Sequence, residues 1–161
     1  MKTLMIIDIQ DGFMNKEYYR DLSKRIEAYL KTTNYDKVIF TKYKNDKSKN
    51  NLYQTKIGWH GLKTQESQNF TITPPTDAII FEKYGYGLSR KDLDYIKSLN
   101  VNEIDICGLK ANACVYAISL QLFDMNIYPN IIWNLVECEP ELKDAMKNIF
   151  IKQFGNVCED N

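Results

Sequence analysis

Histidine is nearly absent from this sequence, since His60 is the only one among 161 residues. Metal sites that use several imidazole ligands are therefore excluded, and any Ser-His-Asp or Cys-His machinery would have to use His60 itself. His60 lies in a polar segment that predicts an exposed loop, where a lone histidine is more often a surface group than a ligand. We expect neither a metal ion nor a cofactor.

The chain also lacks an excess of charge of either sign. Lys plus Arg and Asp plus Glu each total 21, so the formal net charge is zero. Nucleic acids and anionic membrane surfaces attract proteins with a basic excess, so this balance argues against both as partners. No apolar run approaches the ~20 residues that are needed to cross a bilayer.

The N-terminal segment has only a superficial likeness to a signal peptide. Lys2 precedes the apolar run Leu4–Ile9, but the run is short, contains Asp8 and is followed by no small-residue cleavage site. We interpret it as a first buried strand and expect a cytoplasmic protein. The four cysteines are consistent with this expectation, because they form no Cys-x-x-Cys motif and do not make a disulfide framework in a chain of this length.

Short apolar segments alternate with helical patterns along the chain. The apolar segments are rich in β-branched residues, as in strands buried on both faces, and cover residues 4–9, 37–40, 78–81, 104–107 and 130–133. Helical spacing occurs at 22–30 and 142–150, and residues 114–125 are apolar on nearly every side. This order predicts an α/β fold, a three-layer α/β/α sandwich with a mostly parallel sheet of about six strands. The length suits one domain over residues 1–161.

One segment, residues 42–76, interrupts this alternation. It is rich in Lys, Asn, Thr, Ser and Gln and contains Gly58-Trp59-His60-Gly61. A connection of this length in a compact domain is usually a functional loop, a lid or an interface. We expect Trp59 and His60 to belong to the packing of this segment or to a subunit contact.

Polar residues occur at three of the predicted strand ends. Asp8 ends the first strand, Lys83 ends the third, and the turn after the fourth opens a helix at Cys114. Ligands of open α/β sheets bind beyond the carboxyl ends of the strands. An acid, an ammonium group and a thiol can therefore meet at one edge of the sheet.

The chemistry of these three groups is coherent. A cysteine in the first turn of a helix lies at the positive end of the helix dipole, and a nearby ammonium adds to this effect, so we expect Cys114 to favour the thiolate. The Asp8 carboxylate can take the thiol proton and later deliver it to a leaving amine. Free backbone N–H groups in the turn before Cys114 can hold an oxyanion. No histidine is needed.

Each residue also has a purely structural interpretation. A cysteine in an apolar helix is commonly a small buried hydrophobe, a strand-end aspartate is commonly a turn residue, and Lys83 alone would be a surface charge. Cys107 is expected in the core, while Cys138 and Cys158 lie near turns and fit no metal spacing. A redox or thiol-sensing module stays open, although no resolving cysteine lies close in sequence.

Three motifs occur in order at fitting separations: Asp8-Ile-Gln-Asp-Gly-Phe13, Lys83-x-x-Tyr86 and Gly108-x-x-x-x-x-Cys114-Val115. Together they resemble the isochorismatase-like cysteine hydrolase superfamily, which includes nicotinamidases, N-carbamoylsarcosine amidohydrolases and ureidoacrylate hydrolases. The resemblance implies Asp8, Lys83 and Cys114 as the catalytic triad. It also implies a non-proline cis peptide at Leu109-Lys110, with the N–H groups of Lys110 and Cys114 as the oxyanion hole.

The sequence departs from the family pattern at several positions. Ala111 and Gly87 stand where the family usually has Thr or Ser, and Ile118-Ser119 and Gln121-Leu122 replace Thr-Ala and Asp-Ala pairs. Nicotinamidases carry an Asp-x-His metal motif after the second strand, where residues 41–46 here contain no histidine. Isochorismatases proper lack the nucleophilic cysteine, so the resemblance implies an amide-hydrolysing relative that uses no metal.

We therefore predict a cysteine-dependent hydrolase that cleaves a C–N bond of a small amide, carbamoyl or ureido substrate through a thioester. Small-molecule sites are mostly apolar, and the candidate pocket walls are Phe13, Tyr43, Tyr84, Tyr86 and Tyr116. The resemblance also implies a homo-oligomer, either a dimer or a tetramer. The alternative is a noncatalytic binding or interaction protein in which Ala111 and Gly87 mark a degraded site.

Overall fold

The structure is a computed structural model that describes residues 1–45 and 51–158. Within these residues, five parallel strands form one sheet in the order β3-β2-β1-β4-β5. The strands are β1 (Thr3–Ile7), β2 (Lys37–Tyr43), β3 (Ile79–Lys83), β4 (Glu103–Leu109) and β5 (Tyr128–Glu137). The predicted α/β fold is confirmed, with five described strands where about six were expected. Near its end the chain returns beside β5, but Cys158 makes only a single parallel bridge with Ile132.

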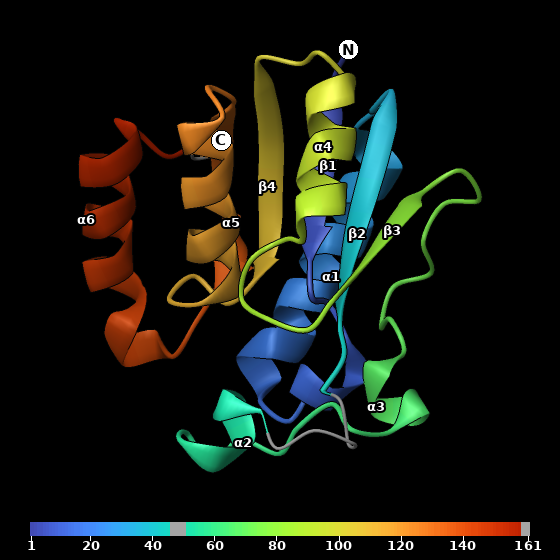
Figure 1. Cartoon of the computed structure of the whole chain (residues 1–161), viewed down its shortest axis with the longest axis vertical. Helices are drawn as coiled ribbons and strands as arrows, with labels where there is room; N and C mark the ends of the chain where they lie inside the picture. The colour runs from blue at the N-terminus through green and yellow to red at the C-terminus, as the bar shows by residue number, and fades with distance from the viewer. Residues whose placement is uncertain (46–50, 159–161) are drawn as a thin grey trace.

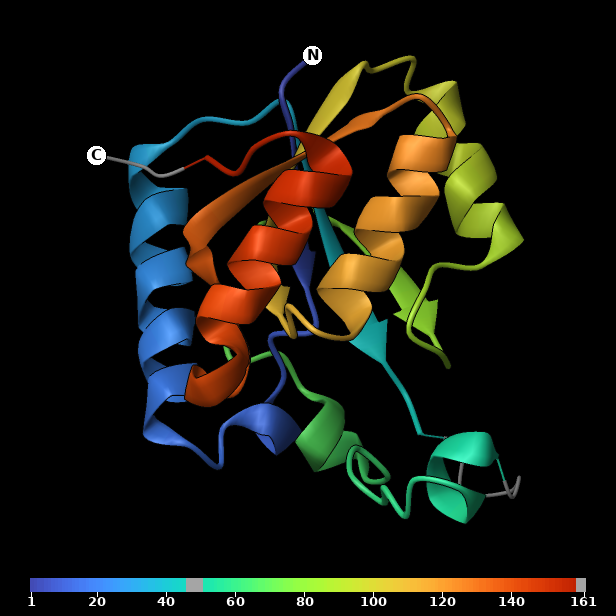
Figure 2. The ribbon, with the colours of Figure 1, turned by 90° about the vertical axis from the view of Figure 1, so that its left-hand side faces the viewer.

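Helices cover both faces of the sheet and make three layers (Figures 1 and 2). One face carries α1 (Glu17–Thr32), and the other carries α4 (Arg90–Ser98), α5 (Cys114–Asp124) and α6 (Lys143–Phe154). The alternation of side chains along β1 explains the two cores. Leu4 and Ile6 pack in the cluster that contains α1 residues, whereas Met5 and Ile7 pack in the cluster with α4, α5 and α6. The central strand is therefore buried on both faces.

The long segment after β2 lies beyond the carboxyl ends of the strands, toward the bottom of Figure 1. Its described part carries two one-turn helices, α2 (Leu52–Thr55) and α3 (Gln65–Gln68). The buried Gln10 side chain accepts a hydrogen bond from the Tyr43 N–H at 2.8 Å and donates to the carbonyls of Tyr43 (2.9 Å) and Gln68 (3.0 Å). These bonds tie the long segment to the end of β1.

Two short 3-10 helices complete the described elements, η1 (Asp11–Phe13) and η2 (Pro140–Leu142). Both follow the carboxyl ends of strands, η1 after β1 and η2 after β5. No helix in residues 1–45 and 51–158 is long and apolar enough to cross a membrane.

Candidate active site

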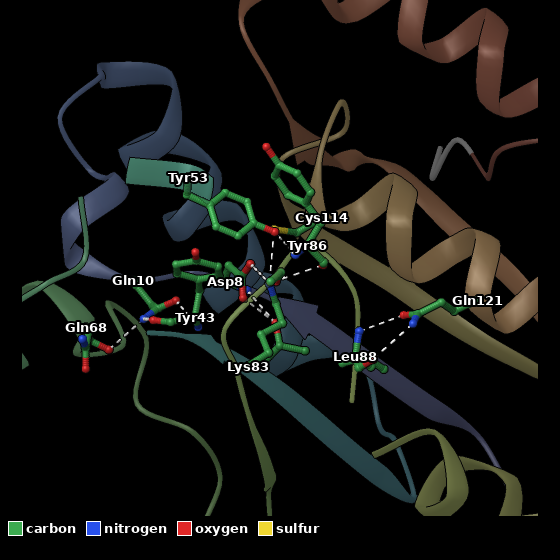
Figure 3. A network of polar contacts seen from close by, with 12 residues as sticks. Asp8, Gln10, Tyr43, Tyr53, Gln68, Lys83, Tyr86, Leu88, Cys114 and Gln121 are labelled. Atoms are coloured by element: carbon green, nitrogen blue, oxygen red, sulfur yellow. Dashed lines mark hydrogen bonds and ion pairs between the residues drawn. The ribbon is translucent and has the colours of Figure 1, made fainter. Parts of the chain in front are cut away.

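The carboxyl edge of the sheet brings the three predicted catalytic side chains together (Figure 3). Asp8 follows β1 directly, Lys83 is the last residue of β3, and Cys114 is the first residue of α5. The Lys83 Nζ lies 2.7 Å from the Asp8 Oδ2 and 3.2 Å from the Cys114 Sγ. All three residues are buried, so their charges interact with little screening by water. The ammonium group bridges the acid and the sulfur.

The backbone and side chain of Asp8 are both held in place. Its φ angle is 53°, in the left-handed region that aspartate visits more readily than most residues. The Thr41 hydroxyl donates a hydrogen bond to the Asp8 Oδ1 at 2.6 Å and accepts one from the Asp8 N–H at 3.1 Å. The other carboxylate oxygen faces Lys83. Thr41, which the sequence analysis did not single out, therefore orients the acid.

Gly108 permits the close approach of β4 and β1 at this edge. Its φ angle is 118°, and a Cβ atom there would lie 2.1 Å from the carbonyl oxygen of Ile7. Ile7 immediately precedes Asp8, so a side chain at position 108 would displace the backbone that carries the acid. Only glycine fits this backbone without such a shift.

The turn between β4 and α5 leads directly into the helix start that carries the sulfur. The peptide bond between Leu109 and Lys110 is cis, and the Lys110 carbonyl accepts hydrogen bonds from Ala113 (3.0 Å) and Val115 (3.1 Å). The N–H groups in the first turn of a helix have no partner within the helix. Cys114 opens α5, so its N–H group is one of the donors that can face a developing oxyanion.

The pKa of Cys114 shifts upward, which is opposite to the expected preference for the thiolate. Burial is the largest influence and the Asp8 carboxylate adds to it, while Lys83 opposes both, and together they raise the pKa of Cys114 to about 12. For Lys83, burial lowers the pKa, but Asp8 and the sulfur raise it by more, so the net shift is upward. A neutral thiol needs a base before it can act as a nucleophile, and the Asp8 carboxylate beside it can accept the proton.

A cavity of about 330 Å³ reaches Cys114. This volume lies within the range of small-molecule sites, about 300–1,000 Å³. The lining residues are Phe13, Tyr43, Tyr53, Ile57, Trp59, Tyr86, Lys110, Asn112, Ala113, Cys114 and Glu139. Three of the predicted wall residues, Phe13, Tyr43 and Tyr86, are among them.

Two predicted wall residues lie elsewhere. Tyr84 follows Lys83 and is 57% exposed, because successive side chains of an extended segment point in opposite directions and Lys83 points inward. Tyr116 lies two residues after Cys114 on α5, and its ring packs against Phe150 and Phe154 of α6. Tyr116 is therefore part of the packing between two helices.

The long segment supplies three wall residues that the sequence analysis missed: Tyr53, Ile57 and Trp59. Trp59 was expected in loop packing or a subunit contact, but its ring stacks with Phe13 at 6.1 Å between centroids and lines the cavity. The Tyr53 hydroxyl accepts a hydrogen bond from the Tyr86 N–H at 3.0 Å. Aromatic residues are rare in this polar segment, and this contrast could have identified Tyr53 and Trp59 as candidates for the cavity wall.

Tyr43 differs from the other wall residues because its hydroxyl is buried without a partner. The residue is 2% exposed, and no hydrogen-bond partner of its hydroxyl occurs within the described residues. Its ring lies 4.9 Å from the Lys83 Nζ, and Figure 3 shows it next to Asp8 and Tyr53. Burial, the largest cause, raises the pKa of Tyr43, so the group stays a neutral donor.

Comparisons with solved structures find the same fold in several amidases. The pyrazinamidase of Pyrococcus horikoshii aligns with a TM-score of 0.80 at 16% identity, covering 99% of both chains. A nicotinamidase/pyrazinamidase of Bacillus subtilis aligns with a TM-score of 0.82 at 18% identity, covering 99% of this chain and 100% of the other. The N-carbamoylsarcosine amidase of Thermoplasma acidophilum aligns with a TM-score of 0.77 at 18% identity, covering 98% of this chain and 95% of the other.

The Pyrococcus enzyme was solved in complex with zinc, but the described residues of this chain do not fit such an ion. In the part of the chain that the structure describes, no group of three His, Cys, Asp or Glu side chains could hold a metal. His60 is exposed and bonds to Lys63 at 2.9 Å. Asp46, the acid in the stretch where nicotinamidases carry their metal motif, lies outside the described residues.

Sequence comparisons identify the family. A search of curated proteins finds no match. The family model of the isochorismatase domain matches residues 2–158, nearly the whole chain. This match agrees with the five-stranded sheet of the described residues and with the amidases that share it. The chain therefore belongs to the isochorismatase domain family.

Proposed function

We propose that this protein is a cysteine-dependent hydrolase that cleaves the C–N bond of a small amide, carbamoyl or ureido compound. The observation that carries the proposal is the Lys83 ammonium, which contacts both Asp8 and Cys114 at a cavity of suitable size. A nucleophile beside a base, with the base oriented by further groups, is the arrangement that covalent catalysis requires. The names of the structural neighbours, pyrazinamidase, nicotinamidase and N-carbamoylsarcosine amidase, agree with this reaction class.

In the first half of the reaction, the Cys114 sulfur attacks the substrate carbonyl carbon while Asp8 takes the thiol proton. The C–S bond forms, and the carbonyl electron pair moves to the oxygen, which the N–H groups of Lys110 and Cys114 bind. Asp8 then delivers its proton to the substrate nitrogen as the C–N bond breaks. Ammonia or an amine leaves, and the acyl group remains on sulfur as a thioester.

In the second half, a water molecule attacks the thioester carbonyl and gives a proton to Asp8. The C–S bond breaks, the carboxylic or carbamic acid leaves, and the proton returns to the sulfur of Cys114. Lys83 keeps its charge throughout. Burial and Asp8 raise the pKa of Cys114, whereas the Lys83 ammonium lowers it. Lys83 therefore stabilises the sulfur as negative charge develops on it.

The positions that depart from the family pattern lie outside the cavity wall, which favours a working site over a degraded one. Ala111 is fully buried in the core. Gly87 faces Gln121, because a Cβ at position 87 would lie 2.7 Å from the Gln121 Oε1. The Gln121 side chain accepts from the Leu88 N–H at 2.8 Å and donates to the Leu88 carbonyl at 3.1 Å. The two departures at 87 and 121 are thus a matched packing pair.

The charges along the cavity favour an uncharged substrate. Lys110 and Glu139 form an ion pair at 2.5 Å, and among the described lining residues no other Lys, Arg, Asp or Glu occurs. A substrate carboxylate would find no unpaired cation there, and burying an unpaired charge is costly. Nicotinamide and pyrazinamide, which carry no charge, fit this lining better than N-carbamoylsarcosine, which carries a carboxylate.

The test is hydrolysis of these three compounds, measured as release of ammonia or amine, with mass spectrometry of quenched protein, intact and after proteolysis, to detect the acyl group. We expect turnover of at least one compound and a mass increase on the peptide that contains Cys114. Cys114→Ala should lose about 10³-fold or more in kcat and form no adduct. Cys107→Ala, which removes a buried thiol that does not line the cavity, serves as the control. Activity retained by Cys114→Ala, or no turnover of any of the three, would contradict the proposal.

A further inference from the structure

A polar cluster joins the ends of β4 and β5 at the mouth of the cavity. The Glu139 Oε1 lies 2.5 Å from the Lys110 Nζ, and its Oε2 accepts a hydrogen bond from the Asn112 Nδ2 at 3.3 Å. The Tyr19 hydroxyl of α1 donates to the Oε1 at 3.5 Å. One carboxylate therefore contacts two side chains of the turn that precedes Cys114.

This turn, residues 110–113, carries the chemistry proposed for the oxyanion. Its backbone already makes one bond to β5, from the Ala111 N–H to the Glu137 carbonyl at 2.9 Å. That bond holds the turn at a single point, next to the last pair in the ladder between β4 and β5. The Lys110 and Asn112 contacts add two points on the side that faces the cavity. A turn held at three points has less freedom to rotate its N–H groups away from the substrate.

Glu139 is charged in this setting. Burial raises the pKa of its carboxyl, but the hydrogen bonds from Lys110 and Asn112 and the Lys110 charge lower it by more, so the net shift is downward. Charge-assisted hydrogen bonds are about twice as strong as neutral ones, which suits a contact that must keep a loop in place.

We propose that Glu139 is a positioning residue for the oxyanion hole. Its carboxylate holds the side chains of Lys110 and Asn112 and so keeps the Lys110 N–H directed at the substrate oxygen. The inference depends on the proposed function, because a misplaced donor lowers the rate only where an oxyanion forms. Glu139 itself touches no reacting atom in this scheme. A misplacement of about 1 Å at such a donor costs on the order of 10²-fold in rate.

Glu137 provides a matched control at the same strand end. It is the last residue of β5, and its carboxylate pairs with Arg25 at 3.0 Å and with Lys143 at 3.1 Å. Its side chain is more buried than that of Glu139, at 18% against 31% exposed, yet it does not line the cavity. Removing it breaks two ion pairs without touching the side chains of the turn.

The kinetic experiment compares Glu139→Ala with Glu137→Ala. We expect Glu139→Ala to lower kcat by about 10-fold to 100-fold with KM unchanged, because the donor acts mainly in the transition state. Glu139→Gln keeps an oxygen acceptor at the same distance and should recover part of the loss. Glu137→Ala should keep the wild-type kcat while its melting temperature falls. Equal kcat losses in Glu139→Ala and Glu137→Ala, or an unchanged kcat in Glu139→Ala, would overturn the inference.

Amide hydrogen exchange gives a second readout that needs no turnover. Exchange in the peptide that covers residues 109–115 should be faster in Glu139→Ala than in wild type and unchanged in Glu137→Ala. Unaltered exchange in Glu139→Ala would overturn the positioning role by itself. Failure of the hydrolase proposal would appear differently, as activity that survives Cys114→Ala.

Discussion

The triad and the cavity wall are built in different ways. Asp8, Lys83 and Cys114 are attached to the ends of two strands and a helix and are joined by an ion pair and a hydrogen bond inside the protein. The opposite wall takes Tyr53 and Trp59 from the long segment after β2, where both are only half-buried. The proposed reacting groups are thus part of the core, whereas much of the cavity wall belongs to a surface connection.

This difference separates chemistry from recognition. Substitutions in the wall can change which compound fits without disturbing the sheet, because loops tolerate change better than the elements they connect. Substitutions at the strand ends change buried charges, so we expect them to alter both the reaction rate and the stability of the fold. Substitutions at the strand ends and in the wall should therefore have separable effects on rate, binding and stability.

The largest effect is expected at the strand end that carries the base. Asp8→Asn removes the proton acceptor, so kcat/KM should fall by about 10²–10⁴-fold. The same change removes a negative charge that raises the pKa of Cys114, so the thiol should ionise at lower pH beside Lys83. Activity and thiolate content should therefore move in opposite directions, measured by hydrolysis and by alkylation rate against pH.

The control for this prediction is Asp11→Asn, three residues along the same motif. Asp11 is exposed, and its Oδ1 accepts a hydrogen bond from the Thr71 hydroxyl at 3.3 Å. It should change neither hydrolysis nor the alkylation profile. An Asp8→Asn variant that hydrolyses as fast as wild type would remove Asp8 from the role of base.

A smaller effect is expected in the wall. Trp59→Ala removes an aromatic surface that stacks with Phe13 and lines the cavity. Burying such a side chain against a ligand is worth about 1.5–3 kcal/mol, so KM should rise by about 10-fold to 100-fold while kcat changes far less. His60→Ala, next in the chain but outside the cavity lining, should leave both constants unchanged. A kcat loss as large as that of Asp8→Asn would mean that wall and triad are not separable.

The same contrast explains what the sequence could predict. Asp8, Lys83 and Cys114 each lie where a buried apolar strand gives way to a polar turn or helix start, and in a parallel sheet such positions share one edge. Glu139 follows β5 at that edge and the same rule could have found it. Trp59 could not be placed this way, because the path of its segment is set by tertiary contacts such as the Gln10 bonds to Tyr43 and Gln68.

Two expectations failed for reasons of burial and direction. The thiolate was inferred from the helix start and a nearby ammonium, but burial and the Asp8 carboxylate raise the pKa of Cys114 by more than Lys83 lowers it. No local sequence pattern reports how deeply a residue is buried. Tyr84 and Tyr116 are close in sequence to Lys83 and Cys114, yet their side chains point to solvent and to α6. Proximity in sequence does not decide the direction of a side chain.

The smallest expected effect concerns the unpartnered hydroxyl of Tyr43. A buried polar group without a hydrogen bond costs about 1–3 kcal/mol, so Tyr43→Phe should leave the free energy of unfolding unchanged or raise it slightly. Tyr35→Phe is the matched control, because the Tyr35 hydroxyl bonds to Asp105 at 2.7 Å and to Tyr29 at 2.8 Å. The free energy of unfolding of that variant should fall by about 1–3 kcal/mol, because the Asp105 carboxylate loses a hydrogen-bond donor that nothing replaces. Urea denaturation measures the free energy of unfolding of both variants. A Tyr43→Phe variant less stable than Tyr35→Phe would show that this wall residue stabilises the fold, as the residues at the strand ends do.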